Sequence, residues 1–352
     1  MSKIRFGLEF AMPEYPIPYW VDMVTSSLEL FDFEQVWVSD NIQSRNVFVG
    51  LTAMAQKLNS ALGTAVTIPY PRNPIDMASA FASISELIGN RELAIGIGPG
   101  GHFYKTIGKM PKPAITVREA VKIMRALLNG EVVRFEDFPT LSSLFNLKVS
   151  GRGKLEFPAK KKIPIFVAVG GPLMLKAAGE LGDGVIYCML TPAGSIAGIE
   201  RGLFKEAVRT VEETRKRAGI SRSFRRIYLV HISISKDEAS AKYFAKRHVS
   251  YAVAETPDPW LMKIGLNPDH AQDIREAYNE GLGMDGAGKA VTDDMSDAFA
   301  IAGTPRQCVE KLDKILKVVS SFDQVILDIA TVGQEMPRAL KLLATEVLPS
   351  FV

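Results

Sequence analysis

Cysteine is nearly absent from this sequence. The 352 residues include two cysteines, Cys188 and Cys308, which lie 120 positions apart and form no CxxC pair. This scarcity excludes a disulfide framework and a cysteine zinc knuckle, because both need several cysteines at short spacings. The histidines, at positions 102, 231, 248 and 270, have no HExxH-like spacing either. The sequence therefore predicts no metal site, and it is compatible with a reducing cytoplasm.

An excess of one charge and a long apolar run are also missing. The 42 basic residues (Lys and Arg) against 39 acidic residues (Asp and Glu) leave a formal net charge of +3. This surplus is too small to favour nucleic acid or an anionic membrane. No segment has the roughly 18 consecutive apolar residues of a membrane span, and residues 1–5 lead directly into a strand pattern. We therefore expect a cytoplasmic protein without nucleic-acid or membrane partners.

Short apolar runs alternate with longer segments of helical period, which is typical of parallel βαβ construction. Eight strands are predicted, at residues 4–10, 35–39, 61–67, 92–97, 163–169, 184–188, 227–233 and 324–329. Helices are predicted at residues 18–30, 47–58, 74–88, 114–128, 172–181 and 193–218, from 236 onward, and at 335–347. This pattern predicts an α/β fold, the (β/α)8 TIM barrel, with a doubly wound open sheet as the alternative.

The chain is longer than a barrel requires. Because a (β/α)8 barrel takes about 250 residues, roughly a hundred residues are left for insertions into one domain spanning 1–352. A turn-rich segment at 130–162, after the fourth strand, and a Pro-, Gly- and Asp-rich segment at 254–296, after the seventh, are the predicted insertions.

The segment LAIGIGPGGHFY matches the glycine spacing of a dinucleotide-binding turn at Gly96, Gly98 and Gly101. Such a turn needs a helix that opens on its last glycine and an acidic residue at the end of the next strand. Here Pro99 interrupts the turn, and Glu119, the acid at the right distance, lies inside a predicted helix. A Rossmann interpretation is therefore disfavoured. The glycines instead suggest close approach of backbone or ligand near the mouth of a barrel.

Active groups of a barrel lie on the loops after the strands, so residues at strand ends are the first candidates. Glu9 ends the first strand between apolar neighbours, where burial keeps a carboxyl protonated and able to act as a general acid; a structural hydrogen bond is the alternative. Asp40 ends the second strand and could hold a ring edge or cap a helix. Gly170 and Gly171 precede a helix that starts at Pro172, which predicts a phosphate site at its first N–H groups, with a plain tight turn as the alternative.

No Ser-His-Asp or Cys-His pairing can be assigned, so hydrolysis is poorly supported. A pocket with glycine walls, a phosphate cradle and few catalytic side chains suits a redox cofactor, which brings its own chemistry.

In their order along the chain these motifs resemble the bacterial-luciferase-like barrel flavoenzymes. The resemblance is strongest to the branch that uses the deazaflavin coenzyme F420, typified by methylenetetrahydromethanopterin reductase. The segments that carry it are FGLEF at 6–10, VWVSD at 36–40, NVF at 46–48, AVT at 65–67, YPRNP at 70–74, AIGIGPG at 94–100, REA at 118–120, IPIFVAVGGP at 163–172, AAGELGDG at 177–184, AFAIAGTP at 298–305 and the segment 339–351. They span nearly the full length.

The resemblance implies roles for individual residues. The positions that would face the cofactor and substrate are Glu9, Asp40 and Asn41. The positions that would bind the cofactor are Ala65, Val66, Thr67, Gly98, Pro99, Gly100, Gly170, Gly171, Pro172 and Cys188. The bond between Ala65 and Val66 is expected to be a non-proline cis peptide against the back of the ring. Two departures concern the substrate: Asn41 stands where relatives often have histidine, and Gly101 where they have an acidic residue.

Three hypotheses follow from the resemblance. The first is an enzyme that transfers hydride from reduced F420 to a small substrate, plausibly the methylene bridge of a tetrahydropterin one-carbon carrier. The second is an FMN-dependent monooxygenase of the same superfamily. The third is a barrel that binds flavin without turnover, or that has lost the ligand and serves in an assembly. The family also implies a homodimer or a higher homo-oligomer.

Overall fold

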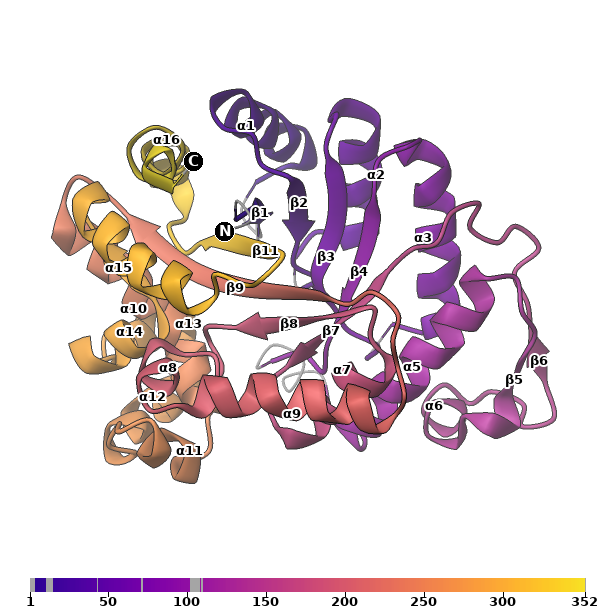
Figure 1. Ribbon diagram of the computed structural model, residues 1–352. Helices are drawn as coiled ribbons and strands as arrows, with labels where there is room; N and C mark the ends of the chain where they lie inside the picture. Colours follow the sequence, from indigo (N-terminus) through magenta and orange to yellow (C-terminus); the bar gives the residue numbers. More distant parts are fainter. Residues whose placement is uncertain are drawn as a thin grey trace.

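Eight parallel strands close into a barrel (Figure 1). The computed structural model describes residues 4–10, 15–42, 44–70, 72–101, 108 and 110–351. The ring closes because β8 pairs with β9 and β11 pairs with β1. Its strands are, in order around the ring, β1 (Phe6–Phe10), β2 (Gln35–Val38), β3 (Ala61–Thr67), β4 (Leu93–Ile97), β7 (Ile165–Val169), β8 (Gly184–Cys188), β9 (Arg225–Ile234) and β11 (Gln324–Ile329). The predicted (β/α)8 barrel is confirmed, and the open-sheet alternative is wrong.

Side chains alternate between the inside of the barrel and the helical layer, because successive residues of a strand point to opposite faces. The outward residues of β1 and β2, such as Leu8 and Val36, belong to the main core against the helices. The inward residues form a separate apolar cluster that fills the barrel. Its buried members are Trp37, Ala65, Ala94, Phe166, Ile186, Ile227, Leu229 and Ile326.

The helices surround the barrel (Figure 1). They are α1 (Ile17–Leu30), α2 (Val47–Lys57), α3 (Pro74–Ile88), α5 (Pro113–Leu128), α7 (Pro172–Leu181), α8 (Ile196–Glu200), α9 (Leu203–Arg217), α15 (Pro305–Val318) and α16 (Met336–Leu342). Four of them, α3, α5, α7 and α15, begin with proline, whose fixed φ suits the first helical position. The single helix predicted over 193–218 is instead α8 and α9, which are separated at Gly202 with a φ of 78°.

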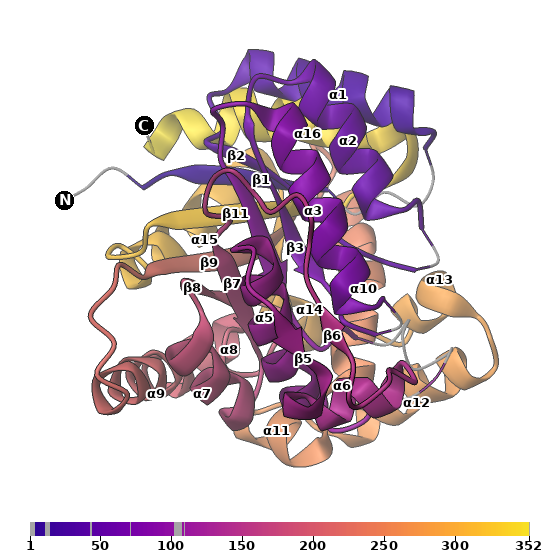
Figure 2. The ribbon, with the colours of Figure 1, turned by 90° about the vertical axis from the view of Figure 1, so that its right-hand side faces the viewer.

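Two segments add structure outside the ring. Between α5 and β7 lie β5 (Val133–Arg134), η1 (Phe135–Asp137), α6 (Pro139–Leu144) and β6 (Arg152–Gly153). Between β9 and α15 lie α10 (Glu238–Glu255), α11 (Asp258–Lys263), α12 (Asp269–Asn279), α13 (Gly283–Gly288), α14 (Asp293–Phe299) and β10 (Ile301–Gly303). Helices α12, α13 and α14 pack on α10 (Figure 2) and share an apolar cluster that is distinct from the barrel core.

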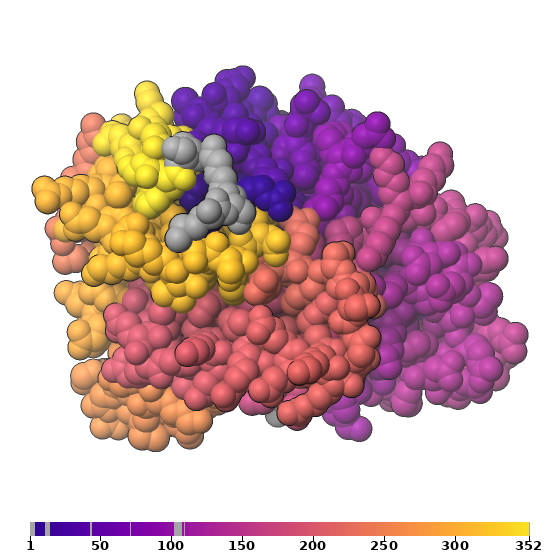
Figure 3. All heavy atoms as spheres, in the orientation of Figure 1, coloured from indigo at the N-terminus to yellow at the C-terminus, as the bar shows by residue number. Residues whose placement is uncertain are grey.

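The last segment of the chain completes the helical layer. After β11 come η2 (Gly333–Glu335), α16, the π-helical turn η3 (Leu343–Val347) and η4 (Leu348–Phe351). Both α16 and η3 contact α1, so the yellow end of the chain lies near the indigo beginning (Figure 3). The rings of Phe6 and Phe351 are 6.5 Å apart. In the described ranges we find no helix with the length and hydropathy needed to span a bilayer.

Candidate active site at the carboxyl ends of the strands

Three polar side chains stand side by side at the carboxyl ends of neighbouring strands. Glu9 of β1 is in register with Asp328 of β11, which is in register with His231 of β9. Residues two positions earlier on these strands, Ile326 and Leu229, belong to the apolar cluster inside the barrel. Because side chains alternate along a strand, Asp328 and His231 also point inward, one layer nearer the mouth. The three side chains are buried.

Asp328 is held by two imidazoles. Its Oδ2 lies 2.6 Å from Nδ1 of His231 and 3.2 Å from Nε2 of His248, a residue of α10. The two imidazole nitrogens are 2.9 Å apart, and the far side of His231, Nε2, is 3.4 Å from Sγ of Cys188. One set of protons satisfies the contacts to Asp328 and Cys188: both imidazoles donate to the carboxylate, and the Cys188 thiol donates to Nε2 of His231. Burial acts to raise the pKa of Asp328, but the hydrogen bonds from His231 and His248 outweigh burial, and the pKa is lowered.

Histidine and carboxylate are also the usual ligands of a metal ion, and these three atoms lie close enough to surround one. Hydrogen bonding among the three already explains their approach. We therefore treat His231, His248 and Asp328 as a hydrogen-bonded group, which we call the triad.

Glu9 has the opposite environment. Its Oε1 accepts a hydrogen bond from the Ser39 hydroxyl, and its buried Oε2 has no hydrogen-bond partner among the described residues. Burial, and then the negative charge of Asp328, raise the pKa of Glu9 well above its ordinary value, although the bond from Ser39 acts against this. Both effects favour the protonated form of the Glu9 carboxyl.

Asp40 is engaged in an ion pair rather than open to a ligand. Nε and Nη2 of Arg72 donate to its two oxygens at 2.8 and 2.9 Å, and the Thr67 hydroxyl donates at 2.9 Å. The carboxylate has no exposed surface, and 16% of the Arg72 side chain is exposed. Asp40 therefore ties β2 to the loop that follows β3. Asn41, half-buried next to it, accepts a hydrogen bond from the Ser44 amide through its backbone carbonyl.

The end of β3 forms a wall beside Glu9. The bond between Ala65 and Val66 is cis, as the resemblance implies. The Ser39 hydroxyl oxygen also lies 3.2 Å from the Ala65 carbonyl oxygen, and the Asp40 amide donates to the Val66 carbonyl at 3.2 Å. A Cβ atom on Gly98 would lie 3.2 Å from Cγ2 of Val66. Glycine is therefore what lets the β4 loop, which continues through Pro99 and Gly100, pack against this wall.

The turn after β7 offers an open helix start. Gly171 is the N-cap residue of α7, and no side chain caps this helix. A Cβ atom on Gly171 would meet nothing within 4 Å, whereas one on Gly170 would lie 3.4 Å from Cγ2 of Thr191 in the loop after β8. Gly170 and Pro172 are exposed. This arrangement is suited to an anion, because the N–H groups and the dipole of a helix start attract negative charge.

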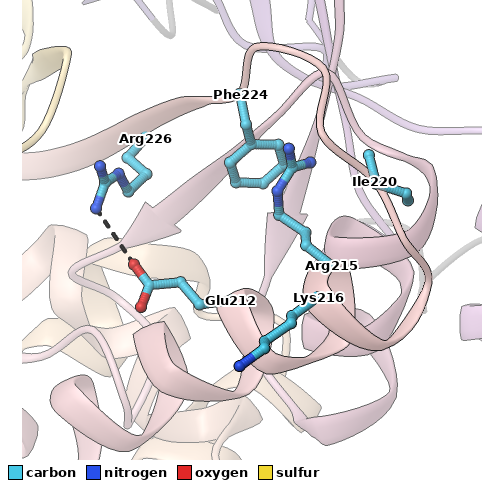
Figure 4. Close-up of a pocket in the computed structure, with 6 residues that line it drawn as sticks. All are labelled: Glu212, Arg215, Lys216, Ile220, Phe224 and Arg226. Carbon is cyan, nitrogen blue, oxygen red and sulfur yellow. Dashed lines mark hydrogen bonds and ion pairs between the residues drawn. The ribbon is translucent and has the colours of Figure 1, made fainter.

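Two cavities lie elsewhere, and no predicted site residue lines either of them. One, of about 400 Å³, is formed by Glu212, Arg215, Lys216, Ile220, Phe224 and Arg226, near the amino end of β9 (Figure 4). There the Arg215 guanidinium stacks 3.9 Å from the centre of the Phe224 ring. The other, of about 600 Å³, lies where β9 ends, between α10 and α16.

Sequence reasoning missed Asp328, His231, His248, Ser39 and Arg72. The first two stand at or near the carboxyl ends of predicted strands, so the strand-end criterion could have found them. His248 comes from α10, and no local signal places it beside Asp328.

Comparison with known proteins gives consistent matches. The family model described as luciferase-like monooxygenase matches residues 20–319. The 5,10-methylenetetrahydromethanopterin reductase of Archaeoglobus fulgidus is 32% identical over 355 aligned positions, covering 98% of this chain and 99% of the relative. The enzyme of the same name from Methanolobus tindarius is 32% identical, with 98% and 100% covered.

A solved structure agrees over the whole length. The coenzyme F420 dependent tetrahydromethanopterin reductase from Methanopyrus kandleri superposes with a TM-score of 0.79 and 27% sequence identity, and all of both chains is covered.

Proposed function

Because the chain belongs to the luciferase-like monooxygenase family, we propose that it is a coenzyme F420-dependent oxidoreductase whose substrate is a methylene-tetrahydropterin one-carbon carrier. One observation carries the proposal: reductases of that substrate match the chain from end to end, at 32% identity. The enzyme would transfer hydride between the reduced deazaflavin and the methylene carbon. The buried, protonated carboxyl of Glu9 in the barrel mouth fits this reaction.

The residues at the mouth fit the cofactor. Reduced F420 supplies a hydride from C5 of its ring. The wall of Ala65 and Val66 would support one face of that ring, and the loop of Gly98, Pro99 and Gly100 would lie along its edge. The uncapped start of α7, at Gly170, Gly171 and Pro172, would bind the phosphate of the cofactor tail. We place Cys188 in the same pocket, because its sulfur lies between the interior of the barrel and His231.

The chain's own residues then have three tasks. The apolar cluster beneath the mouth keeps water away from the reacting carbon. Glu9 holds a proton on Oε2 and would orient the substrate or donate to it as its charge changes. Asp40 with Arg72 fixes the end of β2 and thereby Ser39, which donates to Glu9. Most of the catalysis is positioning.

The experiment is a titration of the purified protein with F420 and with FMN, followed by turnover with methylene-tetrahydromethanopterin under anaerobic conditions. We expect tight binding of F420 and its oxidation when the substrate is added. Tight binding of FMN alone would support the alternative of an FMN-dependent monooxygenase. Binding of neither would favour a barrel without redox activity.

The oligomeric state and the location belong to the same proposal. We place the enzyme in the cytoplasm as a homodimer or higher homo-oligomer. In α2, Val47, Leu51 and Met54 are buried in the core, whereas Val49 is a large apolar residue that is 54% exposed and so could contact a partner subunit. Sedimentation of the native protein, and of a Val49→Glu variant, tests this part.

A further inference from the structure

We propose that the triad of His231, His248 and Asp328 is a positioning device that keeps a fixed negative charge beside Glu9 and so retains the proton on Glu9 Oε2. This inference rests on the proposed function, because it identifies what controls the acid of the same site.

Two neighbouring carboxyls, those of Asp328 and Glu9, receive different numbers of hydrogen bonds. Glu9 and Asp328 are paired in register on adjacent parallel strands, whose separation is about 4.8 Å. Asp328 has two imidazole nitrogens at 2.6 and 3.2 Å. Glu9 has one hydroxyl donor on Oε1 and none on Oε2 within the described chain. Because two buried carboxylates this close do not both ionise, the group with more donors takes the charge and the other keeps the proton.

Among the residues that the structure describes, no neighbouring element reverses this assignment. The loop after β2 presents Ser39, and the charge of Asp40 in the same loop is paired with Arg72. β11 presents Asp328, while β9 and β8 present His231 and Cys188. From α10 come His248 and Tyr251, whose ring centres are 5.6 Å apart. Within the described ranges, no lysine or arginine is a source of the Glu9 shift.

The proton assignment of the triad also supports a net negative charge. Cys188 can donate to Nε2 of His231, since burial raises the pKa of this thiol to about 12 and keeps it protonated. Burial lowers the pKa of His231, which favours a neutral imidazole over an imidazolium. With a neutral His231 and an ionised Asp328, this pair carries one negative charge toward Glu9.

The test is the titration of the Glu9 carboxyl by infrared difference spectroscopy on the full-length protein. The carboxylic-acid C=O band is assigned by its loss in Glu9→Gln, and its intensity is followed with pH in the native protein and in Asp328→Asn. We expect the band at neutral pH in the native protein. In Asp328→Asn its midpoint should fall by about one pH unit or more, because a nearby charge shifts a carboxyl by about 1–3 units.

The matched control is Asp183→Asn. Asp183 is also a buried, ion-paired aspartate, bound to Arg125 and Lys162, but it precedes β8 at the opposite end of the barrel. This variant should leave the Glu9 midpoint unchanged. His231→Phe is the second test variant, which removes the shorter bond to Asp328. In a fraction of the molecules Asp328 rather than Glu9 should then carry the proton. The Glu9 band should therefore weaken at neutral pH.

Absence of a Glu9 band at neutral pH would overturn the inference. So would an unchanged or higher midpoint in Asp328→Asn together with an unchanged band in His231→Phe. The infrared readout needs neither cofactor nor turnover. The inference about Glu9 can therefore fail while F420 binds, and it can hold when F420 does not bind.

Discussion

The start of α7 allows steric bulk and charge to be tested separately. Gly171 is the N-cap residue of this helix, its φ of −138° is accessible to any residue, and a Cβ atom there would have no other atom within 4 Å. Aspartate and asparagine have nearly the same shape, and both are favoured N-caps. Gly171→Asp and Gly171→Asn therefore differ mainly in one negative charge at the point where we place the cofactor phosphate.

The two variants should differ little in stability and more strongly in their affinity for F420. Relative to asparagine, aspartate should stabilise the fold by about 0.3–1 kcal/mol through the helix dipole. A carboxylate about 4 Å from a phosphate should cost about 1 kcal/mol at the dielectric constant of water and about 4 kcal/mol at an effective dielectric constant of 20. The Kd of F420 should thus be about 5-fold to 1000-fold higher for Gly171→Asp than for Gly171→Asn.

Binding is measured by fluorescence titration with F420 at low and high salt, and stability by thermal unfolding. The difference in Kd should shrink at high salt, because the interaction is electrostatic and partly exposed. Equal F420 affinities for the two variants would refute the assignment of the phosphate to this helix start. Loss of folding in Gly171→Asp would contradict the open space described around Gly171.

Other predictions concern the mouth of the barrel. Glu9→Gln should lower kcat by about 10²–10⁴, the range of general acid catalysis, while F420 affinity measured by fluorescence stays close to native. The pKa of Glu9 is raised in the folded protein. Its contribution to stability is therefore fully present below the pKa that Glu9 has in the unfolded chain, and it is lost as the pH rises through the folded pKa. Chemical denaturation at a series of pH values should show this loss in the native protein and not in Glu9→Gln. Asp40→Ala removes the buried carboxylate that is paired with the half-buried Arg72 guanidinium and should lower the free energy of unfolding by about 3 kcal/mol. Asp285→Ala, which removes the exposed carboxylate bound to Arg247, should cost about 0–1 kcal/mol. Cys188, whose pKa is raised to about 12, should react with iodoacetamide at pH 8 far more slowly than a free cysteine, and mass spectrometry of the alkylated protein checks this.

The alternation of short apolar runs with helical segments predicted the barrel, because each buried parallel strand is a short, continuous run of apolar residues in the sequence. The bounds of β3, β8 and β11 agree with the prediction to the residue. The same signal was available for α15, whose buried residues Cys308, Leu312, Ile315 and Leu316 have helical spacing. That helix was missed, because the residues between the predicted insertion at 254–296 and the last strand at 324–329 were assigned no element.

The site was less predictable because its contacts join distant parts of the chain. Glu9 was found because it stands at a strand end between apolar residues. Asp328 and His231 also stand near strand ends, but the histidines were judged by their spacing in sequence, a criterion suited to a metal-binding helix. The bond between Asp40 and Arg72 joins β2 to the loop after β3, and the position of His248 depends on how α10 packs. Neither contact has a local signal.

The central claim is direct hydride transfer from reduced F420 to the methylene carbon of the tetrahydropterin. The most direct test is a single turnover with reduced F420 that carries deuterium at C5, followed by mass spectrometry of the product. The account predicts one deuterium in the new methyl group. Unlabelled product, with the deuterium lost to solvent, would contradict it.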